Sequence, residues 1–552
     1  ISQGDDQVLT YHYDSAHRPT GYSDALGNTV TFVLDAAGNT LEQTITDPNG
    51  NLTQRHRYIV DELSRLRRDI GAQDQTATLD YDLNNNLTEQ RDPNGNPTHY
   101  AFDGLNRLVD TTDADNGHTL YHYDESNKLT SLTDPNGYTT HYRYDAFDNL
   151  IEQTSPDTGI TRFSYDKANN RLSKTDARDY LTTYQYDALN RLTHINYADT
   201  RLNVIYDYDN NANAQYGIGR LTSQVDNSGT TFYSYDVYGN LISQTLQTAK
   251  QSHLINYAYT DSDKLAQLTY PDDSHVDYRY DSAGNLIDLH YTNSLGVNQR
   301  VLNDLTYQPF GPMTSQTFGN GLTTQQVNDL DYRQVQLATP NTVERNYDFD
   351  LNSNITNITD LLNTTNSQYF NYDQQNRLEL AGSDHYGEIN YFYDAAHNRT
   401  SQYTLINTLS LENDYDYALD SNQLLRKTAD SVTHYAYDEN GNMTNNGTYQ
   451  FRYGQDNRLQ SVSMHGQTIA RYHYNAQGQR SSKTVDNKTI HYLYNQSGQL
   501  LTEISQGHDK QLTPLQDQSE ALQSSLTNLQ SEYQKRDNEQ QQLHIQSEVN
   551  QA

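Results

Sequence analysis

Apolar and polar residues alternate along most of this chain with a period of two. Between Tyr138 and Tyr144, for example, even-numbered positions carry Tyr or Thr, whereas odd-numbered positions carry Thr, His or Arg. Side chains two residues apart lie on the same face of a β-strand, so this alternation predicts strands with one tyrosine-rich face and one polar face. Helical periodicity is absent before about residue 505.

The strands recur at a fixed interval. The stretch YHYD at Tyr121–Asp124 returns as YRYD at Tyr142–Asp145, 21 residues later. Six aspartates that close such triplets follow at steps of 21: Asp82, Asp103, Asp124, Asp145, Asp166 and Asp187. Looser copies end at Asp14, Asp35, Asp61, Asp209, Asp236, Asp281, Asp350, Asp373, Asp394 and Asp438, and asparagine takes the aspartate's place at Asn475 and Asn495. A period of this length indicates a repeat architecture, with an irregular middle around residues 285–345.

Each 21-residue unit predicts one β-hairpin. Asp145 ends the first strand, because a short carboxylate can accept backbone N–H bonds in a tight turn, and Asn149 follows within that turn. A second strand opens at Leu150 and closes at another turn, spelled DPNG at 47–50, 92–95 and 134–137. Proline presets φ and glycine supplies a positive φ, so this tetrapeptide is a strong turn signal.

Consecutive hairpins of equal length predict one long antiparallel strip. Roughly two dozen hairpins give about 48 strands at ~4.8 Å each, so the strip is ~230 Å long. A strip this wide twists and coils. At an assumed radius of about 25 Å it completes about one and a half turns, which pack on one another as in other solenoids. We therefore expect an all-β, hollow and partly open shell, in which the tyrosines form the buried seam between units.

The composition agrees with a thin wall rather than a thick core. The chain has 48 Tyr, 11 Phe and no Trp, and only 34% of its 552 residues are hydrophobic. Disordered chains are poor in aromatic residues. The large number of tyrosines therefore favours a folded protein with a thin buried layer. Tyrosine suits such a wall because it combines a large contact area with a hydroxyl that can meet water.

Charge and cysteine content exclude several classes of partner and site. The formal net charge of −34 argues against nucleic acid or an anionic membrane as a partner. This negative charge is consistent with a large β-rich surface that needs charge to stay soluble, or with a basic protein partner or cargo. The chain has no cysteine, so it holds no disulfide and no thiolate metal site. The chain contains no run of 18 apolar residues, so the sequence predicts no transmembrane helix. The chain begins at Ile1 without a signal-peptide pattern, so we expect it to be an excerpt of a longer polypeptide.

These repeats resemble the Rhs/YD-repeat family. The segments "YDALNRLTHINY" (186–197) and "YDSAGNLIDLHY" (280–291) are similar to its standard unit, and "LTYQPFGPMTSQTFGNGLTT" (305–324) is similar to a recurrent Rhs segment. The stretch "YAYDENGNMTNNGTYQFRYGQDNRLQSV" (435–462) resembles the end of such arrays. The resemblance covers about residues 8–505. It implies a β-cocoon of the kind found in bacterial polymorphic toxins, insecticidal toxin complexes and teneurins, which in the toxins encloses an effector released by self-cleavage.

The C-terminal part departs from that pattern. The toxins continue into a segment that bears an autoprotease and then a variable toxin, whereas here a Gln-rich stretch occupies residues 506–552. Its heptad-like spacing of Leu515, Leu522, Leu529 and Leu543 predicts a helix over 512–547. The seam contains Ser, Arg and Gln, so a weakly associating coiled coil, a single helix and a frayed polar tail all stay open. We therefore divide the chain into a repeat shell, 1–505, and this tail.

No catalytic pattern is found in the sequence. The DPNG turns are interpreted as turns rather than protease sites, and no EF-hand loop, H-E-x-x-H, G-x-S-x-G or P-loop occurs. The scattered histidines are interpreted as outward strand residues. The sequence therefore predicts a non-enzymatic protein without metal or cofactor, whose marked residues are those of the repeat: Tyr121, Tyr123, Asp124, Tyr142, Tyr144, Asp145, Tyr184, Tyr186 and Asp187.

Two functions from different classes remain. The first is the structural shell of a secreted or surface bacterial protein, which encloses or presents a toxin or other cargo domain encoded outside these residues. The alternative is an extracellular adhesion or carbohydrate-binding module that uses the exposed aromatic face of the sheet. The corresponding partners are an enclosed effector domain, or a cell-surface glycan or protein.

Overall fold

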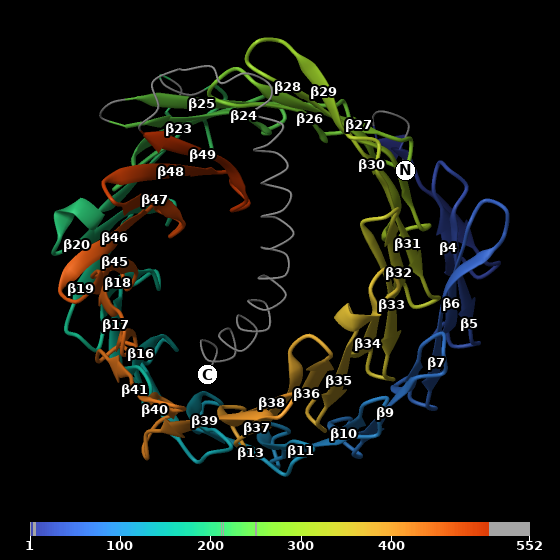
Figure 1. Cartoon of the computed structure of the whole chain (residues 1–552), viewed down its shortest axis with the longest axis horizontal. Helices are drawn as coiled ribbons and strands as arrows, with labels where there is room; N and C mark the ends of the chain where they lie inside the picture. The colour runs from blue at the N-terminus through green and yellow to red at the C-terminus, as the bar shows by residue number, and fades with distance from the viewer. Residues whose placement is uncertain (1, 4–6, 211, 213–214, 249–250, 507–552) are drawn as a thin grey trace.

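The computed structural model describes residues 2–3, 7–210, 212, 215–248 and 251–506, and within these ranges the regular structure is almost entirely β (Figure 1). Two short 3₁₀ helices, η1 (Thr200–Leu202) and η2 (Thr364–Asn366), are the only helical elements among these residues. The prediction of an all-β repeat fold is confirmed.

The strands form one long sheet, one sheet of eight strands and one isolated pair. The isolated pair is β1 (Ser2–Gln3) and β2 (Gln7–Val8). The first half of the long sheet consists of β3 (Thr10–Tyr13), β4 (Pro19–Ser23), β5 (Thr29–Leu34), β6 (Thr40–Thr46), β7 (Leu52–Val60), β8 (Leu66–Ile70), β9 (Thr76–Tyr81), β10 (Leu87–Arg91), β11 (Pro97–Phe102), β12 (Leu108–Thr112), β13 (His118–Tyr123), β14 (Leu129–Thr133), β15 (Thr139–Tyr144), β16 (Leu150–Ser155), β17 (Gly159–Tyr165), β18 (Arg171–Thr175), β19 (Leu181–Tyr186), β20 (Leu192–Tyr197), β21 (Val204–Tyr208) and β22 (Leu221–Asp226). Its second half consists of β23 (Gly229–Tyr235), β24 (Leu241–Gln247), β25 (Ser252–Tyr259), β26 (Leu265–Thr269), β27 (His275–Tyr280), β28 (Leu286–Thr292), β29 (Asn298–Tyr307), β30 (Met313–Phe318), β31 (Thr323–Asn328), β32 (Gln334–Thr339), β33 (Val343–Phe349), β34 (Ile355–Asp360), β35 (Gln368–Tyr372), β36 (Leu378–Ser383), β37 (Gly387–Tyr393), β38 (Arg399–Ile406), β39 (Leu409–Tyr417), β40 (Leu424–Thr428) and β41 (Val432–His434). The eight-stranded sheet consists of β42 (Ala436–Tyr437), β43 (Met443–Asn445), β44 (Gln450–Tyr453), β45 (Leu459–Met464), β46 (Gln467–Tyr474), β47 (Arg480–Val485), β48 (Lys488–Tyr494) and β49 (Leu500–Gln506).

Every strand of the long sheet pairs antiparallel with its neighbours in the sequence. β3 pairs with β4 and β41 with β40, and among the described residues no ladder joins β3 to β41. The strip is therefore an open chain of hairpins rather than a closed barrel, as the equal spacing of the repeats predicts.

Most of the turns that begin with an aspartate share one geometry, whichever residues follow it. In the Asp124 turn, the N–H of Asp124 donates to the carbonyl of Lys128, the N–H of Asn127 donates to the carbonyl of Asp124, and Asn127 has φ 65°. The DPNG turn at Asp134 makes the same pair of bonds, with Gly137 in the left-handed position at φ 89°. This is a type I turn followed by a left-handed residue, a common connection in hairpins. Asparagine and aspartate tolerate the left-handed region, so they replace glycine in the aspartate-led turns. These are Asn85, Asn106, Asn127, Asp148, Asn169 and Asn190, each 21 residues apart.

The strip coils into two stacked windings around a central space (Figure 1). Hydrogen bonds between the windings join residues that are 250 to 288 apart in the sequence. The coil is tighter than the sequence predicted. At the assumed radius of about 25 Å, one winding would need about 33 strands spaced ~4.8 Å apart, whereas one winding of the structure uses about 25 strands. The repeats therefore complete nearly two windings.

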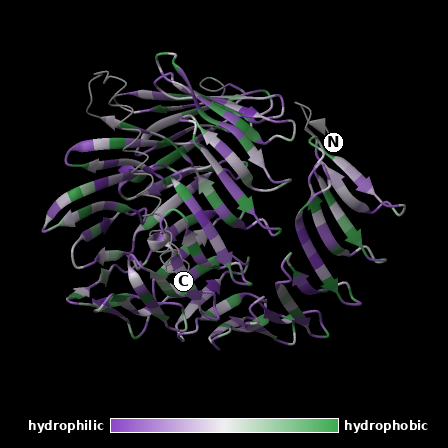
Figure 2. Ribbon diagram, turned by 45° about the vertical axis from the view of Figure 1, so that its right-hand side comes forward, coloured by the Kyte–Doolittle hydropathy of each residue, from purple (hydrophilic) through white to green (hydrophobic). Residues whose placement is uncertain are grey.

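The wall is one sheet thick over most of its length. Hydrophilic and hydrophobic residues alternate along its strands (Figure 2). The chain exposes 32251 Å², whereas a solid globule of 63.2 kDa exposes about 20,000 Å². The residues outside the described ranges account for at most ~9,000 Å² of that excess. A large surface and few buried side chains are what a hollow shell requires.

The predicted helix over 512–547 lies outside the described residues. The repeat array runs to the end of β49 at Gln506, and the division into a shell, 1–505, and a tail, 506–552, remains a prediction.

Candidate functional site: turns, inner wall and winding seam

The aspartate that ends each Tyr-x-Tyr strand organises its own turn. The Asp145 carboxylate accepts the N–H of Phe147 at 2.8 Å and the N–H of Asn149 at 3.0 Å. The Asn149 side chain donates to the same carboxylate at 3.0 Å. Hydrogen bonds from Asn149, first through its side chain and then through its backbone, hold the pKa of Asp145 below its usual value. Asp145 is thereby an anionic cap for the turn at neutral pH.

Side chains four residues after each aspartate connect one unit to the next. Arg107 pairs with Asp103 of its own turn, lies 4.9 Å from the centre of the Tyr123 ring, and donates to the Asp124 carbonyl at 2.9 Å. One guanidinium therefore binds the carboxylate of its unit and the tyrosine and backbone of the next. Where asparagine takes this place, its amide continues the ladder, as Asn149 does by donating to Asn169 at 3.1 Å.

In many units the second tyrosine of the pair also bonds to the preceding unit. The hydroxyl of Tyr186 donates to the Arg171 carbonyl at 3.1 Å, and that of Tyr393 to the Leu378 carbonyl at 2.8 Å. Further tyrosines repeat this bond: Tyr208, Tyr235, Tyr259, Tyr280, Tyr307, Tyr372, Tyr417, Tyr474 and Tyr494. The adjacent strand leaves a carbonyl within reach of each of these hydroxyls, and the expectation that they also meet water stays a prediction.

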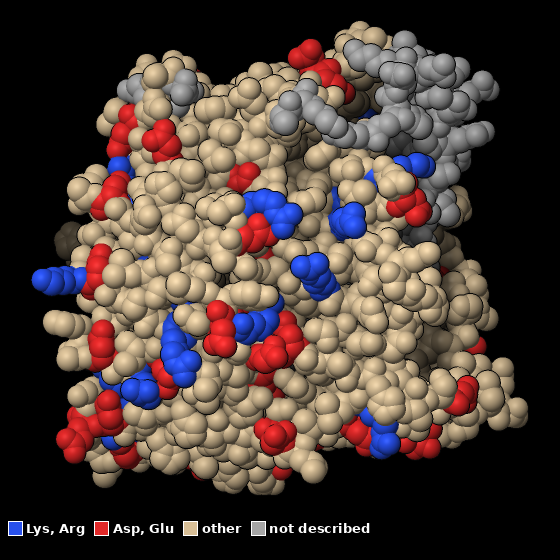
Figure 3. Space-filling model, turned by 90° about the vertical axis from the view of Figure 1, so that its left-hand side faces the viewer, with Lys and Arg blue, Asp and Glu red and all other residues tan. Residues whose placement is uncertain are grey.

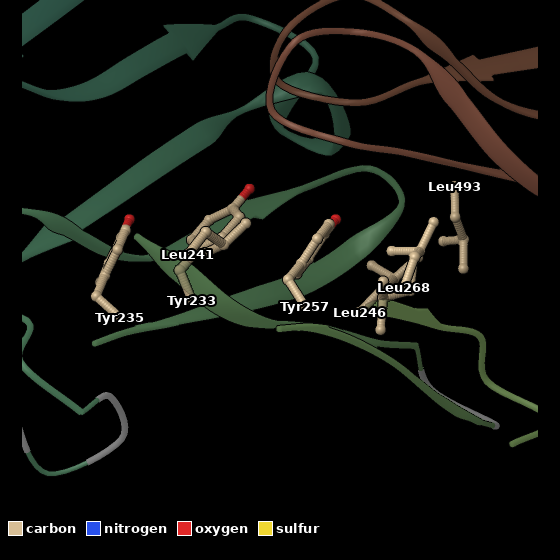
Figure 4. Close-up of a cluster of buried hydrophobic side chains, with 8 residues drawn as sticks. Tyr233, Tyr235, Leu241, Leu246, Tyr257, Leu268 and Leu493 are labelled. Atoms are coloured by element: carbon tan, nitrogen blue, oxygen red, sulfur yellow. The ribbon is translucent and has the colours of Figure 1, made fainter. Parts of the chain in front are cut away.

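The tyrosine face points toward the inside of the coil. Figure 1 draws β48 and β49 on the inner side of β23–β25, and Leu493 of β48 belongs to the same buried cluster as Tyr233, Tyr235 and Tyr257 (Figure 4). Leu501 and Ile504 of β49 pack against this cluster. Since these tyrosines occupy the repeat positions, the Tyr-x-Tyr rows line the interior. Here alone among the described residues the end of the strip doubles the wall into two layers with a sizeable apolar core.

The marked residues of the sequence lie along this wall rather than in one site. Tyr142 and Tyr144 alternate with exposed His141 and Arg143 on β15, and burial raises the pKa of both tyrosines. The marked residues belong to three repeats, of which the first two are adjacent and the third lies two units further on: Tyr121, Tyr123 and Asp124; Tyr142, Tyr144 and Asp145; and Tyr184, Tyr186 and Asp187. A hollow of about 320 Å³ between the first two of these units is lined by Asp124, Tyr142, Tyr144 and Asp145. It is where Lys128 replaces the usual Arg or Asn and pairs with Asp148 at 2.8 Å.

The two windings meet turn on turn along a line that we call the winding seam. Its first-winding turns are 71–75, 92–96, 113–117, 134–138, 155–159, 176–180, 199–203 and 226–229, and its second-winding turns are, in the same order, 329–333, 350–354, 373–377, 394–398, 418–423, 438–442, 454–458 and 475–479. The turns keep the same order in both windings, because hairpins of equal width keep the same pitch, and some turns also contact the neighbour of their partner, as Asn136 does with both Asp394 and Asn422.

Polar side chains hold the winding seam. Asn422 accepts from the Asn136 amide at 2.9 Å, donates to Asp134 at 2.7 Å, and its backbone N–H donates to Asp157 at 2.7 Å. In the next turn, Arg178 binds Asp176 at 2.8 Å and Asp438 at 3.3 Å, with all three side chains largely buried. Sequence reasoning missed these contacts, because the partners are more than 250 residues apart and carry no shared pattern beyond ordinary turn residues.

Close backbone approach at the winding seam needs glycine. Gly441 has φ 77°, and a Cβ there would lie 2.5 Å from the Asp157 carbonyl oxygen. A side chain at this position would therefore push the two windings apart.

Comparison with known proteins identifies the repeat. A family model described as RHS Repeat matches residues 13–52, 81–118, 123–160 and 165–202. The chain carries RHS repeats. It is 29% identical over 125 residues to a tRNA nuclease WapA of Bacillus subtilis (strain 168), and 28% identical over 125 residues to a tRNA3(Ser)-specific nuclease WapA of Bacillus spizizenii. Each match covers 22% of this chain and 5% of the relative.

Solved structures share the fold over most of the chain. A TcdB2-TccC3 structure superposes with a TM-score of 0.75 at 15% identity, and covers 90% of this chain and 32% of its own. The Photorhabdus luminescens Tc holotoxin pore gives a TM-score of 0.74 at 15% identity, covering 88% and 30%. The chain thus spans about a third of these neighbours, and the likeness establishes the coiled shell fold of the RHS repeats.

The outer face of the RHS-repeat wall carries scattered charges of both signs (Figure 3). Across β15–β17, Glu152 pairs with Arg143 at 3.0 Å and with Arg162 at 2.9 Å, on the face opposite the tyrosines. Within the described ranges no group of three or more His, Cys, Asp or Glu side chains is arranged to hold a metal ion. No helix there is long and apolar enough to cross a membrane.

Proposed function

We propose that the chain is a non-enzymatic shell that encloses or presents a toxin or other cargo domain, in a secreted or surface protein. The observation that carries this proposal is that the tyrosine face of the sheet points toward the interior of the coil. Its half-buried tyrosine rows and its last strand, β49, lie on the inner side of the coil. A domain joined after the repeats would therefore start from the interior.

The relatives support this proposal by what their names state. One group is named as tRNA nucleases and the other as components of a Tc holotoxin. The first name states a nuclease and the second a toxin, and these proteins share either part of the repeat sequence or the fold with this chain. The adhesion or glycan-binding alternative has no specific observation in its favour, because the paired tyrosines face inward instead of presenting an outer aromatic surface.

Protease protection of a fused reporter tests the proposal. We would join a small, easily digested reporter domain after Ala552 and, in a matched control, before Ile1. Enclosure predicts that the reporter after Ala552 survives trypsin much longer than the control reporter, while both shells stay intact. Equal digestion of the two reporters in intact shells would contradict an enclosing function.

A further inference from the structure

The inner face of the wall carries basic side chains among its tyrosine rows. Residues that lie directly opposite one another in an antiparallel ladder share a face of the sheet. A charged residue opposite a tyrosine or phenylalanine of the repeat therefore belongs to the inner face. The residues of this kind that are basic form what we call the inner basic set: Arg171, Lys174, Arg399, Lys427, Arg480 and Lys483.

The inner basic set lacks carboxylate partners. No ion pair between described residues includes any of its members, whereas bases on the outer face are often paired, as Arg143 and Arg162 are with Glu152. Burial lowers the pKa of Lys174, and the nearby Asp176 offsets this only in part. These bases therefore lie in the wall without a matching negative charge.

The guanidinium groups of the set lie between aromatic rings. Arg171 is 5.6 Å from the centre of the Phe163 ring and 5.2 Å from that of Tyr184. Arg399 and Arg480 are placed in the same way between tyrosines of adjacent units. An aromatic face attracts a cation but does not neutralise it, so these arginines can still attract an anion.

Acidic residues on the inner face are fewer. Among the described strands, Asp69 lies opposite Tyr58 and Glu503 lies opposite Tyr492. Asp69 is bonded to His56, which leaves Glu503 on the last strand as the acid of this kind without an ion pair. The free charge of the inner tyrosine rows is therefore mostly positive, although the net charge of the whole chain is −34.

The inner basic set occupies one side of the coil. Its members lie on β18 of the first winding and on β38, β40 and β47 of the second. Figure 1 draws β18, β40 and β47 on the left of the coil and β38 at its lower edge. On the other side, charged side chains of the inner face are paired, His56 with Asp69 and Arg345 with Asp360 at 3.7 Å. The lining is thus basic on one side and neutral on the other.

The segment that follows β49 has the complementary charge. Residues 507–552 contain seven Asp or Glu and three Lys or Arg, and the stretch 511–534 contains three acids and no base. β49 ends at Gln506 on the inner side of the coil, two strands along the ladder from β47. A winding of about 25 strands is about 40 Å across, and a segment of this length spans about 70 Å even at the 1.5 Å per residue of a helix. The segment can therefore reach the whole inner basic set.

We propose that residues 507–552 bind along the inner basic set through their carboxylates. This contact holds the segment after the last strand against one side of the inner wall. It does not depend on any cargo, so it can fail while the enclosing function stands.

Salt determines the strength of this contact. Most of the chain's negative charge lies further away, and it is screened over ~8 Å at 0.15 M NaCl, whereas a carboxylate in contact with a guanidinium is screened much less. At 0.5 M NaCl the screening length falls to about 4 Å, and we expect the contact to weaken.

Zero-length cross-linking of the native chain tests the contact, because a carbodiimide joins a carboxylate to an amine only where the two touch. At 1 µM protein and 0.15 M NaCl, we expect links from acids of residues 507–552 to Lys174, Lys427 or Lys483, located by mass spectrometry of the digested monomer. Lys128 and Lys167, in turns at the edge of the first winding away from the winding seam, are the controls and are expected to give no such link. Links to the control lysines alone, or none at all, would overturn the proposal.

Trypsin cleavage after Lys535 and Arg536 tests which charges hold the segment. Rates are taken relative to a free peptide of residues 525–545, which corrects for the effect of salt on trypsin. The triple variant Arg171→Gln, Arg399→Gln, Arg480→Gln is expected to raise the relative rate about fivefold, as is 0.5 M NaCl for the native chain. The matched variant Arg68→Gln, Arg452→Gln, Arg471→Gln removes the same charge from exposed residues of the outer face and is expected to be cleaved like the native chain. Circular dichroism establishes that each variant is folded.

Neutralising the segment itself gives the same test without touching the wall. The variant Asp517→Asn, Glu520→Gln, Glu532→Gln is expected to be cleaved as fast as the wall variant. Equal relative rates for the native chain and both variants, at both salt concentrations, would overturn the binding. Slow cleavage in all of them would then mean that the segment is enclosed but not bound, which separates this proposal from the enclosing function.

Discussion

At the scale of single residues, the repeat aspartate and the residue four positions later account for most of the regularity. The sequence predicted that Asp145 caps a turn, and the structure gives it backbone N–H bonds from Phe147 and Asn149. It did not predict the link from Arg107 to the next unit, because that contact depends on where the neighbouring hairpin lies. The hydrogen bonds within a turn can be predicted from a short segment of sequence. Contacts between units can be predicted only when the spacing of neighbouring hairpins in the sheet is known.

Replacing Asp145 with Ala is expected to lower the melting temperature slightly, by about 1 to 2 °C in a protein of this size. The turn loses an acceptor for two backbone N–H groups, and the other hairpins keep theirs. Thermal unfolding followed by circular dichroism measures this effect. Asp384→Ala, at an exposed turn of the second winding, is the control and is expected to leave the melting temperature unchanged. A loss of all ordered structure would mean that single turns are not independent.

Acid is expected to destabilise the shell below about pH 4. Hydrogen bonds from Asn149 hold the pKa of Asp145 low, and those from Arg191 do the same for Asp187. A carboxyl group whose pKa is lower in the folded state than in the unfolded state stabilises the fold at pH values above its unfolded-state pKa. This stability is lost as the pH falls through the folded-state pKa. Burial raises the pKa of Asp226, which acts in the opposite sense, but the capped turn aspartates are more numerous. Melting temperatures between pH 2.5 and 7 test this prediction, and a stability maximum below pH 4 would contradict it.

At the scale of elements, the period-two alternation and the turn residues were sufficient to predict the hairpins. The pairing of one winding with the other was not predictable in detail, because asparagine and aspartate in a turn look alike whether they face solvent or another turn. Asn422 illustrates this, since its neighbours in the sequence give no sign that it contacts Asp134, Asn136 and Asp157. A sequence signal for the winding seam is the polar residue two positions after several second-winding aspartates, as at Asp331, Asn352 and Asn440.

Replacing Asn422 with Ala is expected to reduce the free energy of unfolding by about 1 to 3 kcal/mol, since partly buried polar partners lose their bonds. Denaturant unfolding measures this free energy, and its dependence on denaturant concentration is expected to stay unchanged. Asp430→Ala, in the turn at the other end of β40, is the matched control and is expected to change stability little. Equal effects of the two substitutions would show that the winding seam contributes no more than an exposed turn.

At the scale of the whole molecule, the thin wall explains the composition. A strip with one tyrosine face and one polar face needs few aliphatic residues and exposes far more surface than a globule of the same mass. The number of windings depended on a radius that no local pattern specifies, so the sequence predicted a coil but not its tightness. The coil in turn determines which turns meet, and hence which edge remains free.

Cross-linking between chosen cysteines tests the two-winding coil most directly, because the native chain contains no cysteine. In the structure, Asn136 contacts Asn422 and Gln224 contacts Gln477 across the winding seam. Double-cysteine variants at these two pairs are expected to react intramolecularly with a short bis-maleimide, as detected by mass spectrometry of the digested monomer. The exchanged pairs, Asn136 with Gln477 and Gln224 with Asn422, are expected to remain uncross-linked. Cross-linking of the exchanged pairs to the same extent, or of none of the four, would contradict the coil.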